Sequence, residues 1–378
     1  MSNARVVIAI ALLAGCGAET PMTAPSTGPD LAGGPKAGPS PISITELPFL
    51  LAFDIDNTGR VIGWEGTGSG PFRSVLWNPV SQQVTDLGDL GGGEALALGM
   101  NEALQIAGSS DDAIGWQAAV WDAGTWHSLP DLGGPVGGAA EDISDTPRAD
   151  GAHWVVGEVS GWSVPVIWSV SGTGTGFTTS SATALPVPVG RRGLAFGVNS
   201  KGAVAGMSLL GDVGLPAAWT TADGTAWQHT ALQIPAGESG GEAADVNAAG
   251  NIIGRTYGNG RACSYALVWA TATSNPTRLP DLAGGTCAWA TAINDAGYIT
   301  GAAQDPRQRF QVVLWIPDGT APSGYVVLAL GRLKGTTSAF ARSLDEPRTA
   351  QGITTLAVVG SSSQASGQRA TLWRVTVP

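Results

Sequence analysis

The chain has 378 residues, of which 43% are hydrophobic, 13% are charged and 55 are glycine. Its net charge of −11 argues against nucleic acid as a partner, because a phosphate backbone is bound by a basic surface. Many glycines with few charges favour short strands and tight turns over helices, and the hydrophobic share is enough for a sizeable core.

The first predicted element is a secretion signal over residues 1–15. Arg5 precedes the apolar run VVIAIALLAG (6–15), which is shorter than the about 20 residues that span a bilayer but typical of a secretory h-region. The run ends in the letters LAGC, which resemble the bacterial lipobox, in which the cysteine, here Cys16, is lipidated and the preceding peptide is removed. An ordinary signal peptide cleaved near Gly17 is the alternative.

Residues 16–41 are predicted to be a lipidated cysteine followed by a disordered tether. The stretch 17–41 holds six prolines and five glycines and little that is apolar, so it cannot bury enough surface to offset its chain entropy. Signal and tether together predict a lipoprotein of the bacterial cell envelope, anchored at the outer membrane and either periplasmic or surface-exposed. Its contact with the membrane is expected to be through the N-terminal lipid only.

Residues 42–378 repeat one unit seven times, and seven units over 337 residues give a period of about 48. The clearest copy is AINDAGYITG (292–301), followed by QVVLW (311–315). The first half of each unit ends on a glycine: Gly63, Gly108, Gly157, Gly206, Gly254, Gly301 and Gly360. A tryptophan follows each glycine by 11 to 15 residues: Trp77, Trp121, Trp168, Trp219, Trp269, Trp315 and Trp373.

Each unit is predicted to form four short strands. Apolar residues alternate around Asn-x-x-Gly, a turn pair that tolerates positive φ, so the first two strands form a hairpin. The segment ending in the tryptophan is a third strand, and the segment ending in Asp-Leu, as in LPDLGG (129–134), is a fourth. One such unit cannot bury both of its faces alone, whereas seven in a ring can, with the repeated tryptophan between neighbours.

The predicted fold is therefore all-β: a seven-bladed β-propeller of four-stranded antiparallel blades. The seventh unit stops soon after Trp373, and ISITELP (42–48) reads as a fourth strand with no unit before it. We expect this N-terminal strand to close the ring beside the C-terminal strand.

The opening stretch DIDNTGRVIGWE (54–65) nearly matches a twelve-residue calcium loop. Such a loop needs a helix on each side, whereas strand patterns flank this one. Asp56 also stands where other units carry Asn101 or Asn199. A hairpin is therefore predicted, with an adventitious cation at Asp54 and Asp56 as the alternative.

The Asn-x-x-Gly, tryptophan and L-x-x-L-G-G elements resemble the HAF-repeat family of bacterial extracellular proteins over about 337 of the 378 residues. The His-Ala-Phe motif that names the family is absent: four residues before each repeated tryptophan stand Arg73, Gln117, Val164, Leu215, Tyr265, Gln311 and Arg369. The resemblance implies a secreted or surface β-propeller, with no reaction attached.

No metal or cofactor is expected, because three histidines and two spare cysteines are scattered through the chain. With Cys16 lipidated, Cys263 and Cys287 remain in an oxidising compartment. They fall in two loops that emerge on the same face of a four-stranded meander, so a disulfide is predicted.

One rim of the ring is the predicted working face, since the connections between second and third strands and those between units share it. Binding loops on a rigid scaffold vary most, as these do between units. The candidate binding residues in these loops are Trp64, Trp116, Trp162, Trp289, Asp89, Asp131 and Asp281.

The leading hypothesis is a monomeric, non-catalytic binding or scaffold propeller that recognises a polysaccharide or a protein partner. The alternative is a polysaccharide lyase or hydrolase that uses rim carboxylates, for which a pair roughly 5–10 Å apart is needed.

Overall fold

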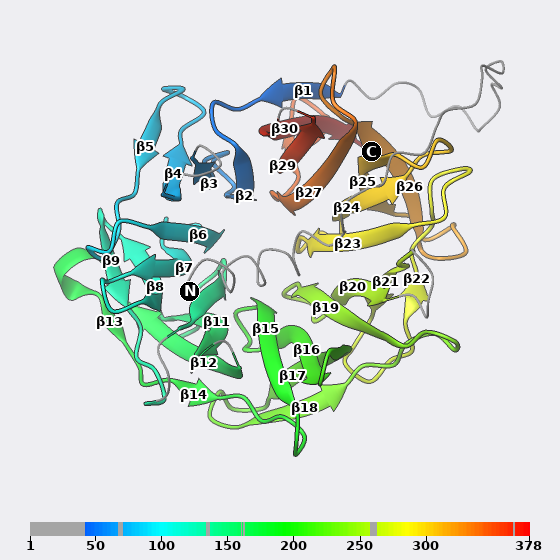
Figure 1. Cartoon of the computed structure of the whole chain (residues 1–378). Coiled ribbons are helices and arrows are strands. Elements are labelled where there is room, and N and C mark those ends of the chain that lie inside the picture. Colours follow the sequence, from blue (N-terminus) through cyan, green and yellow to red (C-terminus); the bar gives the residue numbers. More distant parts are fainter. Residues whose placement is uncertain are drawn as a thin grey trace. The chain divides into compact units, whose positions relative to one another are not determined.

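The computed structural model describes residues 42–66, 71–133, 137–159, 161, 163–257, 263–365 and 367–378. Residues 42–378 form a seven-bladed β-propeller, in which seven antiparallel sheets surround a central axis (Figure 1). The predicted signal, Cys16 and the tether lie outside the described residues. Within the described part, no helix is long and apolar enough to cross a membrane.

Each blade is a meander whose first strand lies next to the axis and whose last strand lies outside (Figure 1). Blade 1 contains β2 (Leu51–Ile55), β3 (Val61–Glu65), β4 (Arg73–Trp77) and β5 (Val84–Asp86). Blade 2 contains β6 (Ala95–Met100), β7 (Ile106–Asp111), β8 (Trp116–Asp122) and β9 (Thr125–Ser128). Blade 3 contains β10 (Ala139–Ile143), β11 (His153–Val159), β12 (Val164–Ser171), the 3-10 turn η1 (Gly174–Gly176), β13 (Thr178–Thr179) and β14 (Thr183–Ala184).

The remaining blades follow the same order. Blade 4 contains β15 (Arg192–Val198), β16 (Val204–Leu210), β17 (Val213–Thr221) and β18 (Trp227–Ala231). Blade 5 contains β19 (Gly240–Val246), β20 (Ile252–Tyr257), β21 (Ala266–Trp269) and β22 (Thr277–Arg278). Blade 6 contains β23 (Ala288–Ile293), β24 (Ile299–Gln304), β25 (Phe310–Pro317) and β26 (Tyr325–Gly331). Blade 7 contains β27 (Ser338–Leu344), β28 (Arg348–Ala350), β29 (Ile353–Gln364), β30 (Gly367–Val377) and, from the start of the domain, β1 (Ser43–Glu46).

The predicted closure of the ring is confirmed. β1 pairs antiparallel with β30, from Ser43 opposite Arg374 to Glu46 opposite Thr371. Leu47 then enters the core between blades 7 and 1, with Phe49 packed beside it. The two ends of the domain consequently leave it on the same face, the one that carries the hairpin turns between first and second strands.

The repeated glycine is explained by a bulge in every first strand. In all seven blades a buried alanine before the bulge faces that glycine, as Ala290 faces Gly301. The bulge brings the carbonyl of the preceding residue over the glycine, so a β-carbon on Gly301 would come closer than 3.0 Å to the oxygen of Trp289. The position therefore needs glycine because of close approach, not because of its backbone angles.

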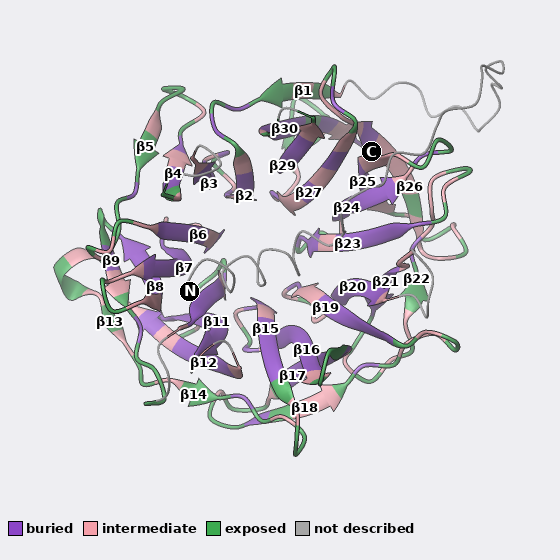
Figure 2. Ribbon diagram, in the orientation of Figure 1, coloured by how far each residue is buried: buried purple, intermediate pink, exposed green. Residues whose placement is uncertain are grey.

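The repeated tryptophans fill the spaces between blades, as predicted. Trp168, Trp219, Trp269, Trp315 and Trp373 are among the largest fully buried side chains. In Figure 2 the buried residues run along the inner and middle strands of the blades, whereas the outermost strands are largely exposed. In five blades the indole N–H donates, over 2.6–3.1 Å, to a backbone carbonyl just after the last strand of the preceding blade: Leu87, Pro130, Pro186, Gln233 and Pro280.

The Leu-Pro-Asp-Leu motif follows the fourth strand instead of ending it, which corrects the prediction: β9 stops at Ser128 and the motif begins at residue 129. Proline has no N–H to give to a strand ladder, and its free carbonyl serves the next blade's tryptophan.

The stretch from Asp54 to Glu65 is the predicted hairpin, β2 paired with β3. Asp56 accepts hydrogen bonds from the backbone of Thr58 (2.9 Å) and Arg60 (2.8 Å) and pairs with the Arg60 guanidinium. Its oxygens therefore hold the turn. In the described part of the chain, no three His, Cys, Asp or Glu side chains gather as a metal-binding group.

The predicted disulfide is present between Cys263 and Cys287, whose α-carbons lie 4.8 Å apart. It joins the residues before β21 to those before β23, and the Ala288 N–H donates to the Ser264 carbonyl beside it (3.1 Å). The bond thus links blade 5 to the connection that leads into blade 6.

Candidate functional site

The candidate site is one face of the ring, which we call the loop rim. It consists of the connections between the second and third strands of each blade and of the connections from one blade to the next. Because successive strands of a meander run in opposite directions, these two kinds of connection leave the sheet at the same end. Part of the rim lies in residues that the structure does not describe, among them the predicted Trp162.

The structure places the three described tryptophans of the prediction in strands and not in loops, so that part of the prediction is wrong. Trp64 is the last residue but one of β3, Trp116 begins β8 and Trp289 lies in β23, each at the rim end of its strand. Trp64 and Trp289 are only 7% and 8% exposed, and Trp116 is half-buried. Two of the three are therefore covered before any ligand arrives.

Both buried tryptophans are held by other aromatic rings. Trp64 stacks on Phe72 with ring centres 4.3 Å apart. Trp289 contacts Phe310 at 4.5 Å and stacks on Phe340 at 5.7 Å. Phe72 belongs to the same blade as Trp64, whereas Phe340 lies in β27, so Trp289 also joins blade 6 to blade 7. A sugar could stack on either tryptophan only after these contacts open.

The three predicted aspartates lie in the connections between blades and shape their turns. Asp89 accepts from the N–H of Gly91 (2.6 Å) and Gly93 (3.1 Å), and Asp131 accepts from that of Gly133 (2.7 Å). Asp281 pairs with Arg278. Asp89 and Asp131 are exposed on the rim, whereas Asp281 is half-buried.

Exposed aliphatic side chains gather on the loop rim, a feature that sequence reasoning missed. Nine large hydrophobic side chains are exposed among the described residues, and six of them lie at the rim of blades 1 to 4. Leu50, Ile114, Leu132 and Val189 stand in connections, and Leu210 and Val213 stand at the rim ends of β16 and β17. Single exposed apolar residues are ordinary, and a contiguous apolar patch marks an interaction surface. No periodic pattern could reveal these residues, because they lie in or next to the variable connections.

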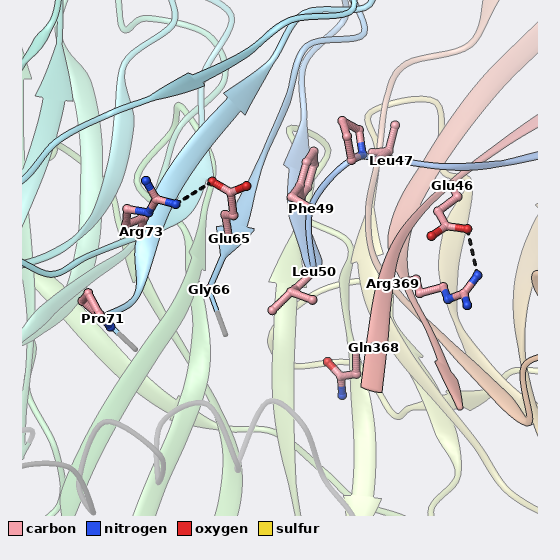
Figure 3. A pocket seen from close by; sticks show the side chains of 11 residues that line it. Glu46, Leu47, Phe49, Leu50, Glu65, Gly66, Pro71, Arg73, Gln368 and Arg369 are labelled. Atoms are coloured by element: carbon pink, nitrogen blue, oxygen red, sulfur yellow. Dashed lines mark hydrogen bonds and ion pairs between the residues drawn. The ribbon is translucent and has the colours of Figure 1, made fainter. Parts of the chain in front are cut away.

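A groove opens on the rim where blade 7 meets blade 1 (Figure 3). Its volume is about 700 Å³, within the range of ligand-binding clefts. Leu50 and Phe49 supply apolar surface from the connection between β1 and β2. The other lining residues come from β1 and the connection after it, from β3, β4 and the connection between them, and from β30: Glu46, Leu47, Pro48, Glu65, Gly66, Pro71, Arg73, Gln368 and Arg369.

Each wall of the groove carries an ion pair. Arg73 donates to Glu65 over 3.1 Å on the blade 1 side, and Arg369 donates to Glu46 over 3.0 Å on the blade 7 side (Figure 3). Exposed ion pairs contribute little to the stability of the fold. A ligand could therefore replace one member of such a pair at a small cost in free energy.

One pair of carboxyl groups converges near the axis, as the hydrolase alternative requires. Glu141 of β10 and Glu158 of β11 lie on paired strands and interact with each other. Burial raises the pKa of both, that of Glu141 to about 7. They are 9% and 1% exposed, however, so they are packed between blades and a polysaccharide cannot reach the inner one.

No protein-family model and no curated protein matches the chain. Among solved structures, it is similar to TolB from Acinetobacter baumannii (13% identity, TM-score 0.41, 75% of this chain and 64% of that one). It is also similar to a puromycin-hydrolysing peptidase of Mycobacterium tuberculosis (15%, 0.41, 80% and 49%) and to YCF48 bound to D1 peptide (13%, 0.43, 89% and 97%). The chain thus spans less than two thirds of the length of the first two. At these identities and scores, the likenesses establish neither a family nor a function.

Proposed function

We propose that the protein is an envelope-anchored, non-catalytic propeller that binds a protein partner through its loop rim. The observation that carries the proposal is that six of the nine exposed aliphatic side chains lie on that face, one of which, Leu50, also lines the groove of about 700 Å³. Protein interfaces bury such side chains at their centre and surround them with polar groups, and burying one contributes about 1.5–3 kcal/mol.

A protein fits the rim better than a polysaccharide does. Sugars are bound by stacking on exposed aromatic rings. The described part of the rim exposes leucine, isoleucine and valine, while Trp64 and Trp289 are covered and Trp116 is half-buried. The ion pairs at the groove walls add polar groups that could orient a partner.

The decisive experiment compares two triple variants of the full chain, tagged at the C-terminus and expressed in its own cells. The rim variant carries Ile114→Ser, Leu210→Ser and Val213→Ser. The matched control carries serine at the three exposed aliphatic positions outside the rim: Val80, Val326 and Ile353. After cross-linking, a partner protein should be recovered with the wild type and the control and fall at least about tenfold with the rim variant.

Equal recovery with both variants at unchanged melting temperature would remove the rim from the binding site. Release of products from a panel of polysaccharides by the wild-type protein would establish the lyase or hydrolase alternative. The envelope anchor is tested separately by mass spectrometry of the mature N-terminus, where we expect lipid on Cys16. A terminus that begins beyond Cys16 would exclude the anchor.

A further inference from the structure

Two rim connections at the joint of blades 6 and 7 bring four positive charges together. The turn between β24 and β25 carries Arg307 and Arg309, and the connection between β26 and β27 carries Arg332 and Lys334. The whole chain has only 19 lysines and arginines and a net charge of −11. A local excess of positive charge is therefore unusual in this protein. Figure 1 shows β24, β25 and β26 in blade 6 and β27 in the neighbouring blade 7.

One carboxylate stands among these charges, and its hydrogen bonds are already filled. Asp305 is 5% exposed and accepts from the backbone N–H of Arg307 (2.8 Å) and Arg309 (3.0 Å). Its second oxygen accepts from Nε and Nη2 of Arg309 (3.0 and 2.7 Å) and from Nε2 of Gln311 (3.2 Å). Asp305 thus orders the turn and offsets one of the four charges.

Arg332 is fixed beside this carboxylate without gaining a full partner. Its Nε donates to the Thr336 carbonyl over 2.9 Å, and its Nη1 lies 4.0 Å from the shared oxygen of Asp305. Burial and the neighbouring Arg309 lower the pKa of Arg332, against the opposing effect of Asp305. Two guanidinium groups therefore share one oxygen, with N–H groups left over for another acceptor.

The remaining two cations stand free at the edge of the cluster. Arg307 and Lys334 are exposed and form no ion pair with any residue that the structure describes. The hairpin turn from Asp56 to Arg60 has the same aspartate-to-arginine spacing but holds a single arginine, with Glu102 close by. The cluster at blades 6 and 7 is thus more than a turn-forming ion pair.

We infer that Arg307, Arg309, Arg332 and Lys334 form a binding site for an oxyanion, a phosphate or a carboxylate group carried by a ligand. Guanidinium groups bind both through paired, charge-assisted hydrogen bonds, and Arg332 and Arg309 are held in place by their existing contacts. The inference does not depend on the proposed function, because the site is tested with small anions.

The test measures binding of two small probes, tripolyphosphate and citrate, to the full-length protein by calorimetry at physiological salt. We expect the wild type to bind at least one of them, and the stronger of the two tells phosphate from carboxylate recognition. The double variant Arg307→Gln/Lys334→Gln should weaken binding at least about tenfold, as expected for the loss of charged hydrogen bonds.

The matched control is Arg191→Gln/Arg192→Gln, which removes the same charge from exposed or half-buried arginines elsewhere on the rim. Arg191 donates to the Ser208 carbonyl over 3.5 Å, and Arg192 donates to the Gly211 carbonyl over 3.4 Å. We expect less than about a threefold loss there, because surface charge alone is screened by salt. Equal weakening in both variants, or no binding of either probe by the wild type, would overturn the site.

Discussion

Replacing Gly301 by alanine tests whether the repeated glycine is dictated by the bulge in the first strand. The three backbone atoms nearest to the added β-carbon, two from Trp289 and the α-carbon of Ala290, would all lie at 3.0 Å or less. All belong to the first strand of the same blade, so no side chain can swing away and the strand itself must move. Overpacking of this kind costs about 1–3 kcal/mol and occasionally more, and we expect about 3 kcal/mol here because the obstacle is backbone.

The assay is chemical unfolding in urea, followed by tryptophan fluorescence, with Gly319→Ala as the control. Gly319 has open space around its α-carbon and no positive φ, so alanine there should be neutral or stabilise the protein by up to about 1 kcal/mol. If Gly301→Ala unfolds within about 0.5 kcal/mol of the wild type, the close-approach explanation of the repeat is wrong.

Three further predictions concern the fold. Reduction of the Cys263–Cys287 bond should cost roughly 3 kcal/mol of stability, and two titratable thiols in the unreduced protein would contradict the bond. Deletion of residues 42–48 should lower the melting temperature markedly, since it removes β1 and the buried Leu47; an unchanged value would count against ring closure. Burial raises the pKa of Asp54 to about 7 and that of Asp245 to about 6, so the folded state holds protons that the unfolded chain releases above about pH 4. The free energy of unfolding should then fall as pH rises from about 4 to about 7 and Asp54→Asn should flatten that slope; an equally steep slope in the variant would refute the assignment.

The ring was predictable because every unit has the same residues at the same places and buries its two faces against its neighbours in the same way. A glycine, a tryptophan and a turn at fixed places identify four strands without knowledge of any contact, and the unmatched segment 42–48 then has one place to go. The two cysteines followed from the same topology, since a meander fixes which loops share a face. The sequence could not show the β-bulge. It follows the pair of Ala290 and Gly301 and shifts the register of the two strands by one residue before Ala292.

The rim was predicted as a face but not in its details. In the sequence, Trp64 and Trp289 resemble exposed ligand-binding residues, because they are not among the tryptophans that recur in every unit. In the structure they pack against Phe72, Phe310 and Phe340. Phe310 and Phe340 come from other strands and Phe72 from the connection after β3, so no local pattern predicts these contacts. The basic cluster was missed for the same reason, because its two turns are 23 residues apart and meet only through the blade joint.

The closure has a mechanical consequence. Both chain ends leave at the same end of the β1–β30 ladder, so a force that pulls the N-terminal segment away from the body loads the Ser43–Arg374 pair first. The strand would then peel one residue at a time, each hydrogen bond resisting with only about 1 kcal/mol, instead of shearing as a whole. Peeling stops where Leu47 and Phe49 enter the core, because their buried side chains must leave it before the strand can detach further. These two side chains therefore resist opening of the ring under force.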